Sequence, residues 1–302
     1  MNELILSLQS LEDRVLLSGN VSAQGADIVV VGTIADDFIE VRQIGSELRI
    51  LVNDFDHGTF QLPAGVVDVQ ALGGNDNIRF QAGITADAVI RGGLGNDTIR
   101  AGAGNDFIFG DPGADIIFGR AGDDIIRGSS GDNVIRGQSG DDVLSGANNG
   151  INYIAGGSGD DSLIGGMGDD VLLGQGGADM INAVAGDDTI IGGSGDDVLD
   201  GGSGNDRING NAGDDNLIGG NGDDELNGGF GDDSLRGNDG ADVINGAFGN
   251  DFVSGGSGDD VVFGASGDDE LRGGSGNDSL NGGAGIDTGL DIGELLHINI
   301  EL

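Results

Sequence analysis

The sequence predicts an all-β solenoid of short strands and tight turns, with two nine-residue repeats in each coil. Three observations predict this fold. Gly and Asp recur with a period of nine from Gly92 onward, an aliphatic residue follows each periodic Asp by two positions, and Gly makes up 65 of the 302 residues. A fixed period of this kind is the signature of repeat architectures. It excludes simple disorder, which the Gly content and charge would otherwise suggest.

The composition limits the classes of partner. The net charge is −41, all 12 basic residues are Arg, and Cys is absent. Such a charge disfavours nucleic acids and anionic membrane surfaces and favours cations. No run of 18 apolar residues is present, so we expect no membrane span.

Residues 1–24 predict an amphipathic, sorting-like segment. The segment lacks the basic start of an ordinary secretory signal. Residues 11–18, LEDRVLLS, resemble the LEPR-XLL segment near the start of many exported bacterial repeat proteins, with Asp13 in place of Pro. The resemblance implies a sorting element. The apolar residues follow helical spacing: Leu4, Ile5, Leu8, Leu11, Val15 and Leu16.

Residues 25–91 predict a strand-rich N-terminal cap. Strands are expected within residues 26–33, 37–44, 47–54 and 66–72, which are rich in β-branched residues. Asp37 and Asp76 stand at the Asp position of two eroded copies of the repeat. A cap here covers a sheet edge that would otherwise invite aggregation.

Residues 92–288 contain 22 repeats, numbered here from position one to nine with the periodic Asp at position six. Position four is Gly in all 22, and one extra residue enters near Asn148 and Asn149. Position eight is Ile, Leu or Val in all but the last repeat, where Gly289 stands. Position six is Asn133 and Asn152 in two repeats and Asp in the others: Asp97, Asp106, Asp115, Asp124, Asp142, Asp161, Asp170, Asp179, Asp188, Asp197, Asp206, Asp215, Asp224, Asp233, Asp242, Asp251, Asp260, Asp269, Asp278 and Asp287.

Each repeat predicts one turn and one very short strand. Gly supplies the positive φ that tight turns need, and position eight points inward by the period-two rule of strands. Two repeats return the chain above its start, so the coils stack about 4.8 Å apart. The thin aliphatic interior is too small to offset an ordering cost of about 1–2 kcal/mol per residue. The turns must therefore contribute stability.

The stacked turns predict divalent metal sites. Two position-six carboxylates and several main-chain carbonyls meet in each gap, which suits Ca²⁺ with its about six to eight oxygen ligands better than Mg²⁺. Zinc and copper prefer N and S ligands, and the chain offers only His57 and His297. Ten gaps on each of two flanks give up to about 20 Ca²⁺ ions, whose charge nearly balances −41. Twelve repeats carry a second Asp at position five, which we expect to point away and raise the local field.

The repeats GGSGDDVLD and GGSGNDRIN, residues 192–209, resemble the repeats-in-toxin (RTX) nonapeptide, or hemolysin-type calcium-binding repeat, an established calcium-binding motif. The resemblance covers residues 92–287 and implies an exported, right-handed parallel β-roll. It implies that each ion is held by the position-six residues of both stacked turns and by carbonyls of positions two and four of one turn and one and three of the next. The position-four ligands then include Gly195, Gly204, Gly213, Gly222, Gly231, Gly258 and Gly267.

Residues 289–302 predict a C-terminal capping strand. Its apolar residues alternate with polar ones: Leu296, Ile298, Ile300 and Leu302.

The sequence predicts no catalytic site. It has no Lys for a P-loop, no H-E-x-x-H and no G-x-S-x-G, and an Asp pair repeated along a rod is structural. We therefore expect that the protein is not an enzyme.

Position nine predicts a ladder of amides one coil apart, formed by Asn209, Asn227, Asn245 and Asn281 with Phe263 between them. The ladder is interpreted either as a stabilising element or as a recognition stripe. Position nine also predicts exposed apolar patches: Phe109, Phe118, Ile164, Leu173, Ile191 and Ile218.

Together these features predict a calcium-dependent structural or adhesive rod that is secreted or lies at the cell surface. The expected partners are a surface or matrix component or a second copy. The alternatives are a binding or secretion module for a separate enzyme or toxin chain, and a calcium buffer or mineral-binding protein. The gap between Asn133 and Asn152 is predicted to be empty or poorly occupied, because it has no position-six carboxylate.

Overall fold

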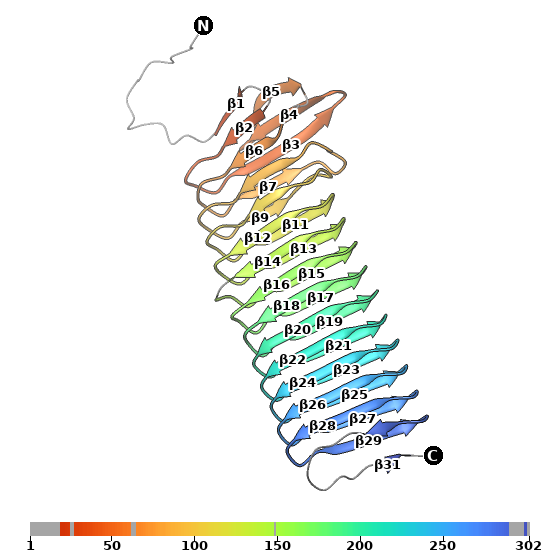
Figure 1. Ribbon diagram of the computed structural model, residues 1–302. Coiled ribbons are helices and arrows are strands. Elements are labelled where there is room, and N and C mark those ends of the chain that lie inside the picture. The colour runs from red at the N-terminus through yellow and green to blue at the C-terminus, as the bar shows by residue number, and fades with distance from the viewer. Residues whose placement is uncertain (1–18, 25–26, 62–64, 148, 290–298, 301–302) are drawn as a thin grey trace.

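The computed structural model describes residues 19–24, 27–61, 65–147, 149–289 and 299–300 and shows a rod of stacked coils (Figure 1). Within these residues no apolar helix is long enough to cross a membrane. The predicted N-terminal helix and the LEPR-XLL-like residues 11–18 lie outside the described residues, as do residues 290–298, 301 and 302 of the predicted C-terminal strand. These expectations stay predictions.

The strands form two long sheets. Sheet 1 contains β1 (Asn20–Gln24), β2 (Asp27–Val31), β6 (Val67–Gln70), β8 (Ala88–Arg91), β10 (Phe107–Phe109), β12 (Ile125–Ser129), β14 (Val143–Ala147), β16 (Ser162–Gly166), β18 (Met180–Val184), β20 (Val198–Ser203), β22 (Asn216–Asn221), β24 (Ser234–Asp239), β26 (Phe252–Ser257), β28 (Glu270–Ser275) and β30 (Thr288–Gly289).

Sheet 2 contains β3 (Phe38–Ile44), β4 (Glu47–Val52), β5 (Phe55–Gln61), β7 (Asn77–Phe80), β9 (Thr98–Arg100), β11 (Ile116–Ala121), β13 (Val134–Ser139), β15 (Tyr153–Ser158), β17 (Val171–Gly176), β19 (Thr189–Ser194), β21 (Arg207–Ala212), β23 (Glu225–Phe230), β25 (Val243–Phe248), β27 (Val261–Ser266), β29 (Ser279–Ala284) and β31 (Asn299–Ile300).

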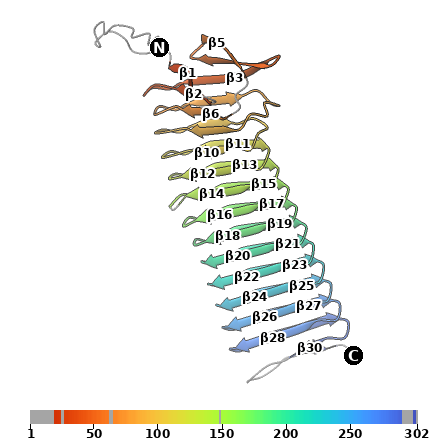
Figure 2. The same cartoon turned by 45° about the horizontal axis from the view of Figure 1, so that its top comes forward.

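Successive repeats alternate between the two sheets, whose strands run in opposite directions on the two sides of the rod (Figure 2). Each strand of the repeats pairs in parallel with the strand one coil away, as Ile208 pairs with Leu226. Spacing between paired residues is 18 except across the coil that contains Asn149, where Ile135 pairs with Ile154 at 19. The predicted parallel β-roll, its two repeats per coil and the inserted residue are confirmed.

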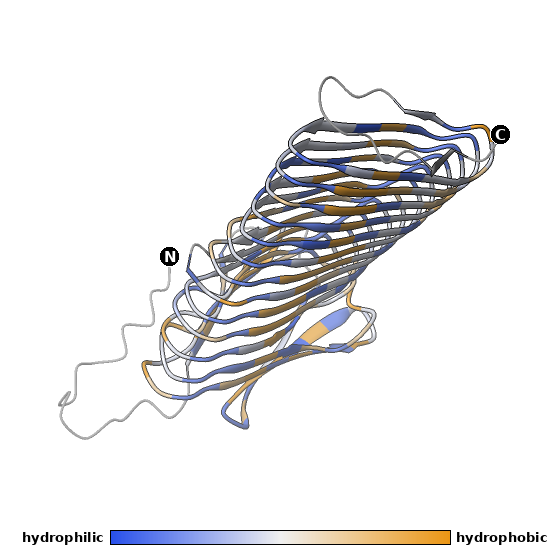
Figure 3. Ribbon diagram, turned by 90° about the horizontal axis from the view of Figure 1, so that it is seen from below, coloured by the Kyte–Doolittle hydropathy of each residue, from blue (hydrophilic) through white to orange (hydrophobic). Residues whose placement is uncertain are grey.

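The core is a double row of aliphatic side chains at position eight. Ile99, Ile190 and Leu235 are fully buried, and their neighbours at positions seven and nine are more exposed. Figure 3 shows hydrophobic segments at the same place in successive coils. The core row therefore follows directly from the period-two alternation of the strand.

The turns use positive φ at two positions. Position four is always Gly, for example Gly204 at 129° and Gly213 at 141°. Position two also adopts positive φ but accepts other residues, such as Arg120 at 86° and Val184 at 87°. A Cβ would overlap a carbonyl of the preceding coil at either position, that of Gly195 from Gly213 and that of Gly202 from Gly220, so this contact does not distinguish position four. The difference is in φ: the non-Gly residues of position two lie between 67° and 87°, whereas position four reaches values such as 141°, which are open almost only to Gly.

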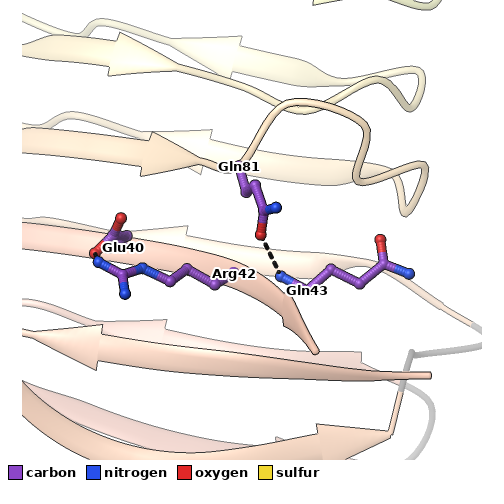
Figure 4. Close-up of polar contacts among 4 residues, drawn as sticks. All are labelled: Glu40, Arg42, Gln43 and Gln81. Atoms are coloured by element: carbon purple, nitrogen blue, oxygen red, sulfur yellow. Dashed lines mark hydrogen bonds and ion pairs between the residues drawn. The ribbon is translucent and has the colours of Figure 1, made fainter. Parts of the chain in front are cut away.

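The N-terminal end is closed by antiparallel strands. The four predicted strands are present as β2, β3, β4 and β6, and the structure adds β1, β5 and β8, which the sequence did not indicate. β4 and β5 extend sheet 2 as a meander beyond β3, while β1 pairs with β2. Gln81 in the loop after β7 accepts a hydrogen bond from the backbone N–H of Gln43 at 2.9 Å, which ties this loop to β3 (Figure 4).

Candidate metal centres between stacked turns

The turns stack into two flanks. Flank 1 contains the turns that lead into sheet 1, such as those of Asp197 and Asp215, and flank 2 contains those that lead into sheet 2, such as those of Asp188 and Asp206. The position-six side chains are almost completely buried on both flanks. The structure therefore brings the predicted Asp residues together in two continuous ranks.

One oxygen of each position-six side chain holds the neighbouring coil. The backbone N–H of Asp188 donates to Oδ1 of Asp206, and that of Asp206 donates to Oδ1 of Asp224, both at 2.8 Å. The same bond recurs in all 20 gaps of the array, with Asn Oδ1 as acceptor where Asn133 or Asn152 replaces Asp. Each carboxylate is thus oriented by the turn that precedes it.

The second oxygen is left without a hydrogen bond. Oδ2 is buried and unpartnered in every periodic Asp except Asp106, where the N–H of Gly102 donates to it at 3.2 Å. This oxygen lies over the position-one Gly. A Cβ on Gly201 would overlap both Oδ2 of Asp206 and the carbonyl oxygen of Gly219 in the next coil. The unpartnered Oδ2 therefore lies beside a main-chain carbonyl oxygen of the next coil.

The position-four carbonyl oxygens of the Asp repeats that the structure describes also lack a hydrogen-bond donor. Those of the predicted ligands Gly195, Gly204, Gly213, Gly222 and Gly231 each point at the position-four Gly of the next coil. Across the described Asp repeats, no hydrogen bond to a position-four carbonyl is found. These carbonyl oxygens belong to partly exposed residues and are therefore available for the predicted role as ligands. Gly258 points in the same way at Gly276, and Gly267 at Gly285.

At the two Asn turns, the side-chain amide groups donate hydrogen bonds to the position-four carbonyls. Nδ2 of Asn133 donates to the carbonyl of Gly131 at 2.9 Å, and Nδ2 of Asn152 donates to that of Gly150 at 3.0 Å. Nδ2 of Asn133 also donates to Oδ1 of Asn152 at 3.2 Å. The amide thus supplies the positive end of a dipole at the place where the Asp turns have none.

Position five forms a second ladder of opposite polarity. The N–H of Asn205 donates to Oδ1 of Asp187, and the N–H of Asp223 donates to Oδ1 of Asn205, both at 2.8 Å. These side chains are exposed, as expected, but they also accept a hydrogen bond from the next coil, which the sequence did not predict. Position five therefore contributes to stacking as well as to the field.

Two acidic residues of the cap extend the rank on flank 2. The N–H of Asp76 donates to Oδ1 of Asp97 at 2.8 Å, and the N–H of Asp37 donates to Oδ1 of Asp76 at 2.6 Å. Oδ2 of Asp76 is unpartnered, whereas Asp37 accepts hydrogen bonds from Thr33 and Asn53. Asp76 is therefore a candidate ligand that the predicted set omitted, and Asp37 ends the rank.

Burial raises the pKa of most of these carboxyl groups. Where it does, desolvation is the largest cause, and nearby carboxylates add to it. The pKa of Asp115, Asp197 and Asp233 is raised to about 7, and that of Asp124 to about 8. The ordinary pKa of an Asp side chain is 3.8, so these raised values show that the charged carboxylate is unfavourable in the metal-free folded chain.

Acidification is expected to stabilise the metal-free roll. A carboxyl pKa that is higher in the folded than in the unfolded state means that the folded chain binds more protons, so stability rises as the pH falls. The gain begins below about pH 8 and is complete only below the unfolded pKa near 3.8. Circular dichroism of calcium-depleted protein should therefore show more β structure at pH 5 than at pH 8. Asp124→Asn should reduce this pH dependence, and a flat pH profile would contradict the burial of charged carboxyl groups.

The site fits a hard divalent cation. Within the described residues no three His, Cys, Asp or Glu side chains converge. Each gap instead offers two carboxylates and main-chain carbonyls, an all-oxygen set of flexible geometry that suits Ca²⁺. His57 lies in the cap, beside Phe55 and away from both ranks.

The predicted position-nine ladder is present in part. Nδ2 of Asn227 donates to Oδ1 of Asn209 at 3.1 Å, and Nδ2 of Asn245 donates to Oδ1 of Asn227 at 2.9 Å. Phe263 separates Asn245 from Asn281 in the register. Because the amides bond one another, they favour the interpretation as a stabilising ladder.

The predicted apolar patches are largely covered. Ile164 is exposed, while the other predicted members are partly buried. Arg91 and Arg127 lie over the ring of Phe109, and Arg100 and Arg136 over that of Phe118. The aromatic part of position nine is therefore a stack of rings and guanidinium groups.

The family model of the RTX calcium-binding nonapeptide repeat matches this chain from residue 83 to residue 288. The matched segments are 83–117, 91–126, 118–148, 146–181, 182–217, 218–253 and 254–288. None of the curated proteins compared with the chain matches it.

Proposed function

This chain belongs to the RTX calcium-binding nonapeptide repeat family, and on that premise we propose that calcium bound between its stacked turns folds an exported structural or adhesive rod. RTX repeats bind Ca²⁺, and the β-roll is a structural calcium-binding module. The individual ligands, the number of ions and the biological role are the substance of the proposal.

One observation carries the assignment of ligands. The position-six carboxylates are buried and oriented through Oδ1, and all but that of Asp106 leave Oδ2 without a hydrogen bond. The position-four carbonyls of the same turns also accept no hydrogen bond in the described Asp repeats. Unpaired buried charge of this density is strongly unfavourable. Calcium supplies two positive charges and a coordination shell of oxygens that satisfies these atoms. We assign the ligands to the 20 periodic Asp residues, their position-four glycines and Asp76, with about 20 ions in all.

The Asn133 to Asn152 gap provides a test of this ligand set. Replacing both residues, Asn133→Asp with Asn152→Asp, should add at least one bound calcium per chain, because two carboxylates replace amides that occupy the carbonyls of Gly131 and Gly150. Calcium content after equilibrium dialysis measures the change.

The matched control for this variant is Asn205→Asp with Asn277→Asp, which adds the same charge at exposed position five on the same flank. The control should leave the calcium content unchanged. An equal rise in both variants would mean that charge alone attracts the ions. Full calcium density in the wild-type gap would refute its predicted vacancy.

The regular rod is the basis for the structural or adhesive role. Calcium is millimolar outside cells, in the range that loosely assembled extracellular sites require. The proposed location is therefore extracellular or at the cell surface, and the alternative is a module that works with a separate enzyme or toxin chain. Affinity capture from the native envelope in calcium tests the role. Self-association or capture of surface components supports the rod, whereas a specific hydrolase or toxin supports the alternative.

A further inference from the structure

The basic residues are concentrated near the N-terminal end of the rod. Eight of the 12 Arg residues lie between residues 42 and 136. Some of them have nearby carboxylates, as Arg42 pairs with Glu40 and Arg49 pairs with Asp56. Arg79, Arg100 and Arg120, the arginine cluster, have no ion pair in the described residues. Arg100 lies over the ring of Phe118, but among the described residues none of the three has a carboxylate partner, which is unexpected in a chain of charge −41.

The fold brings the three side chains to one place. Arg79 on β7 stands directly opposite Arg100 on β9 in the parallel register. Arg120, at the end of β11, reaches back so that its Nη1 donates to the carbonyls of Phe80 and Ala101, each at 2.8 Å. All three line one cavity of about 300 Å³, and its other lining residues are Phe38 and Asn77.

Among the described residues, no carboxylate lines this cavity. The nearest acidic side chain by register is Glu40, opposite Arg79 on β3. Its Oε2 accepts a hydrogen bond from Nη2 of Arg42 at 2.6 Å, and the two side chains lie together in Figure 4. Glu40 is therefore already paired with another cation. Arg79 is exposed and has no polar partner in the described part of the chain.

The cluster is unfavourable without a ligand. Burial lowers the pKa of Arg120, and the charges of Arg79 and Arg100 lower it further. Arg120 also holds positive φ at 86°, a conformation that disfavours residues other than Gly. Its two bonds to carbonyls fix Nη1 and leave Nε and Nη2 unpartnered in the described residues. Guanidinium groups remain charged at any physiological pH, so the repulsion is not relieved by loss of a proton.

We propose that the arginine cluster binds a tetrahedral oxyanion, a phosphate or sulfate group, carried on a small organic molecule or on a polymer. Planar guanidinium groups donate paired hydrogen bonds that match such oxygens. The cavity volume reaches the range of small-molecule sites, and Phe38 with Asn77 provides an apolar and a polar wall for the group that carries the anion. The site is independent of the calcium ligands, since no position-six residue lines it.

Isothermal titration calorimetry of the full chain in calcium tests this site. The probes are glucose 6-phosphate for an ester, inorganic sulfate for the free ion, and glucose as the uncharged control. Saturable binding of one glucose 6-phosphate or one sulfate per chain, without binding of glucose, supports the site. A lower dissociation constant for the ester would show that the site recognises an anion carried on an organic group. A lower dissociation constant for sulfate would show that it recognises the free ion. Absence of saturable binding by both anions would overturn the proposal.

Variants separate a local site from general charge. Arg79→Gln removes a side chain without an internal partner, so the fold should persist while the affinity falls about tenfold. Arg120→Lys keeps the charge but loses the planar fork and should also weaken binding. Arg236→Gln, far along the rod, changes the net charge equally and should change affinity less than about twofold.

Equal effects of Arg79→Gln and Arg236→Gln on anion affinity, or no effect of Arg79→Gln, would show that the cluster only joins neighbouring coils and is not an anion site. Circular dichroism of each sample checks the calcium-dependent fold separately. A failure of the anion site is therefore distinct from a failure of the proposed calcium function.

Discussion

Removal of calcium is expected to abolish most of the β-sheet signal of this protein at neutral pH. The folded repeats bury two ranks of carboxyl groups whose second oxygen has no hydrogen-bond donor. The aliphatic core is only one side chain deep in each sheet and cannot offset that charge. Because the ligands come together only in the folded coils, binding energy becomes folding energy.

Far-UV circular dichroism during a calcium titration measures this effect, starting from calcium-depleted protein. We expect a cooperative transition with a midpoint of about 10⁻⁴–10⁻³ M, since each formed coil is a template for the next. Mg²⁺ serves as the control and should give little structure at the same concentration, because it demands stricter geometry. An unchanged β spectrum in the depleted protein would show that the core and caps hold the rod unaided.

Gly213→Ala is expected to destabilise the calcium-loaded roll by at least about 2 kcal/mol. Gly213 has φ of 141°, a region nearly closed to residues with a Cβ, and the added methyl would overlap the carbonyl of Gly195. That carbonyl is also a candidate calcium ligand. The substitution should therefore lower both the unfolding temperature and the calcium content.

Gly176→Ala is the matched control for this substitution. Gly176 stands at position three of a turn, has no positive φ, and its added Cβ would lie 3.4 Å from Oγ of Ser194, an ordinary contact. Its effect on stability should stay within about 0.5 kcal/mol. Thermal unfolding in saturating calcium compares the two variants. Equal losses of stability would show that any methyl group in the turns is disruptive, independent of position four.

The structure of the repeats was predictable because the residues of each nonapeptide favour the same turn and strand that the rod requires. Periodic Asp206 and Gly204 specify the turn, and Ile208 specifies the buried face, so one nonapeptide contains the information for its place in the rod. The stacking of Asn133 on Asn152 followed from counting alone. The family match supports the same segment of the chain.

The cap was less predictable because its contacts are not periodic. Asp76 and Asp97 are separated by 21 residues, and Asp37 and Asp76 by 39, so the period of nine does not connect them. The satisfaction of Asp37 depends on Asn53, which β3 and β4 bring back by a hairpin. Strand β5 has a mixed burial pattern without clean alternation, which leaves no strong strand signal.

The second ladder at position five was missed for a different reason. Its acceptors and donors belong to different coils, and the sequence does not show whether a side chain points toward the preceding or the following coil. The arginine cluster was missed for a similar reason, since Arg79 and Arg100 stand at position nine of their repeats but Arg120 stands at position two. Only the stacking of coils and the reach of Arg120 bring them together.

The Asn133 to Asn152 step gives the rod a mechanical seam. Elsewhere position six offers at least one carboxylate at each coil boundary on both flanks. At this boundary the position-six residues of flank 2 are joined by amide hydrogen bonds alone, while flank 1 has Asp142 and Asp161. Tension along the axis would load the two flanks unequally there. The rod would then bend open on flank 2 and extend at this coil before the longer blocks on either side unravel. In the surface role proposed above, this coil is where a loaded rod is expected to extend first.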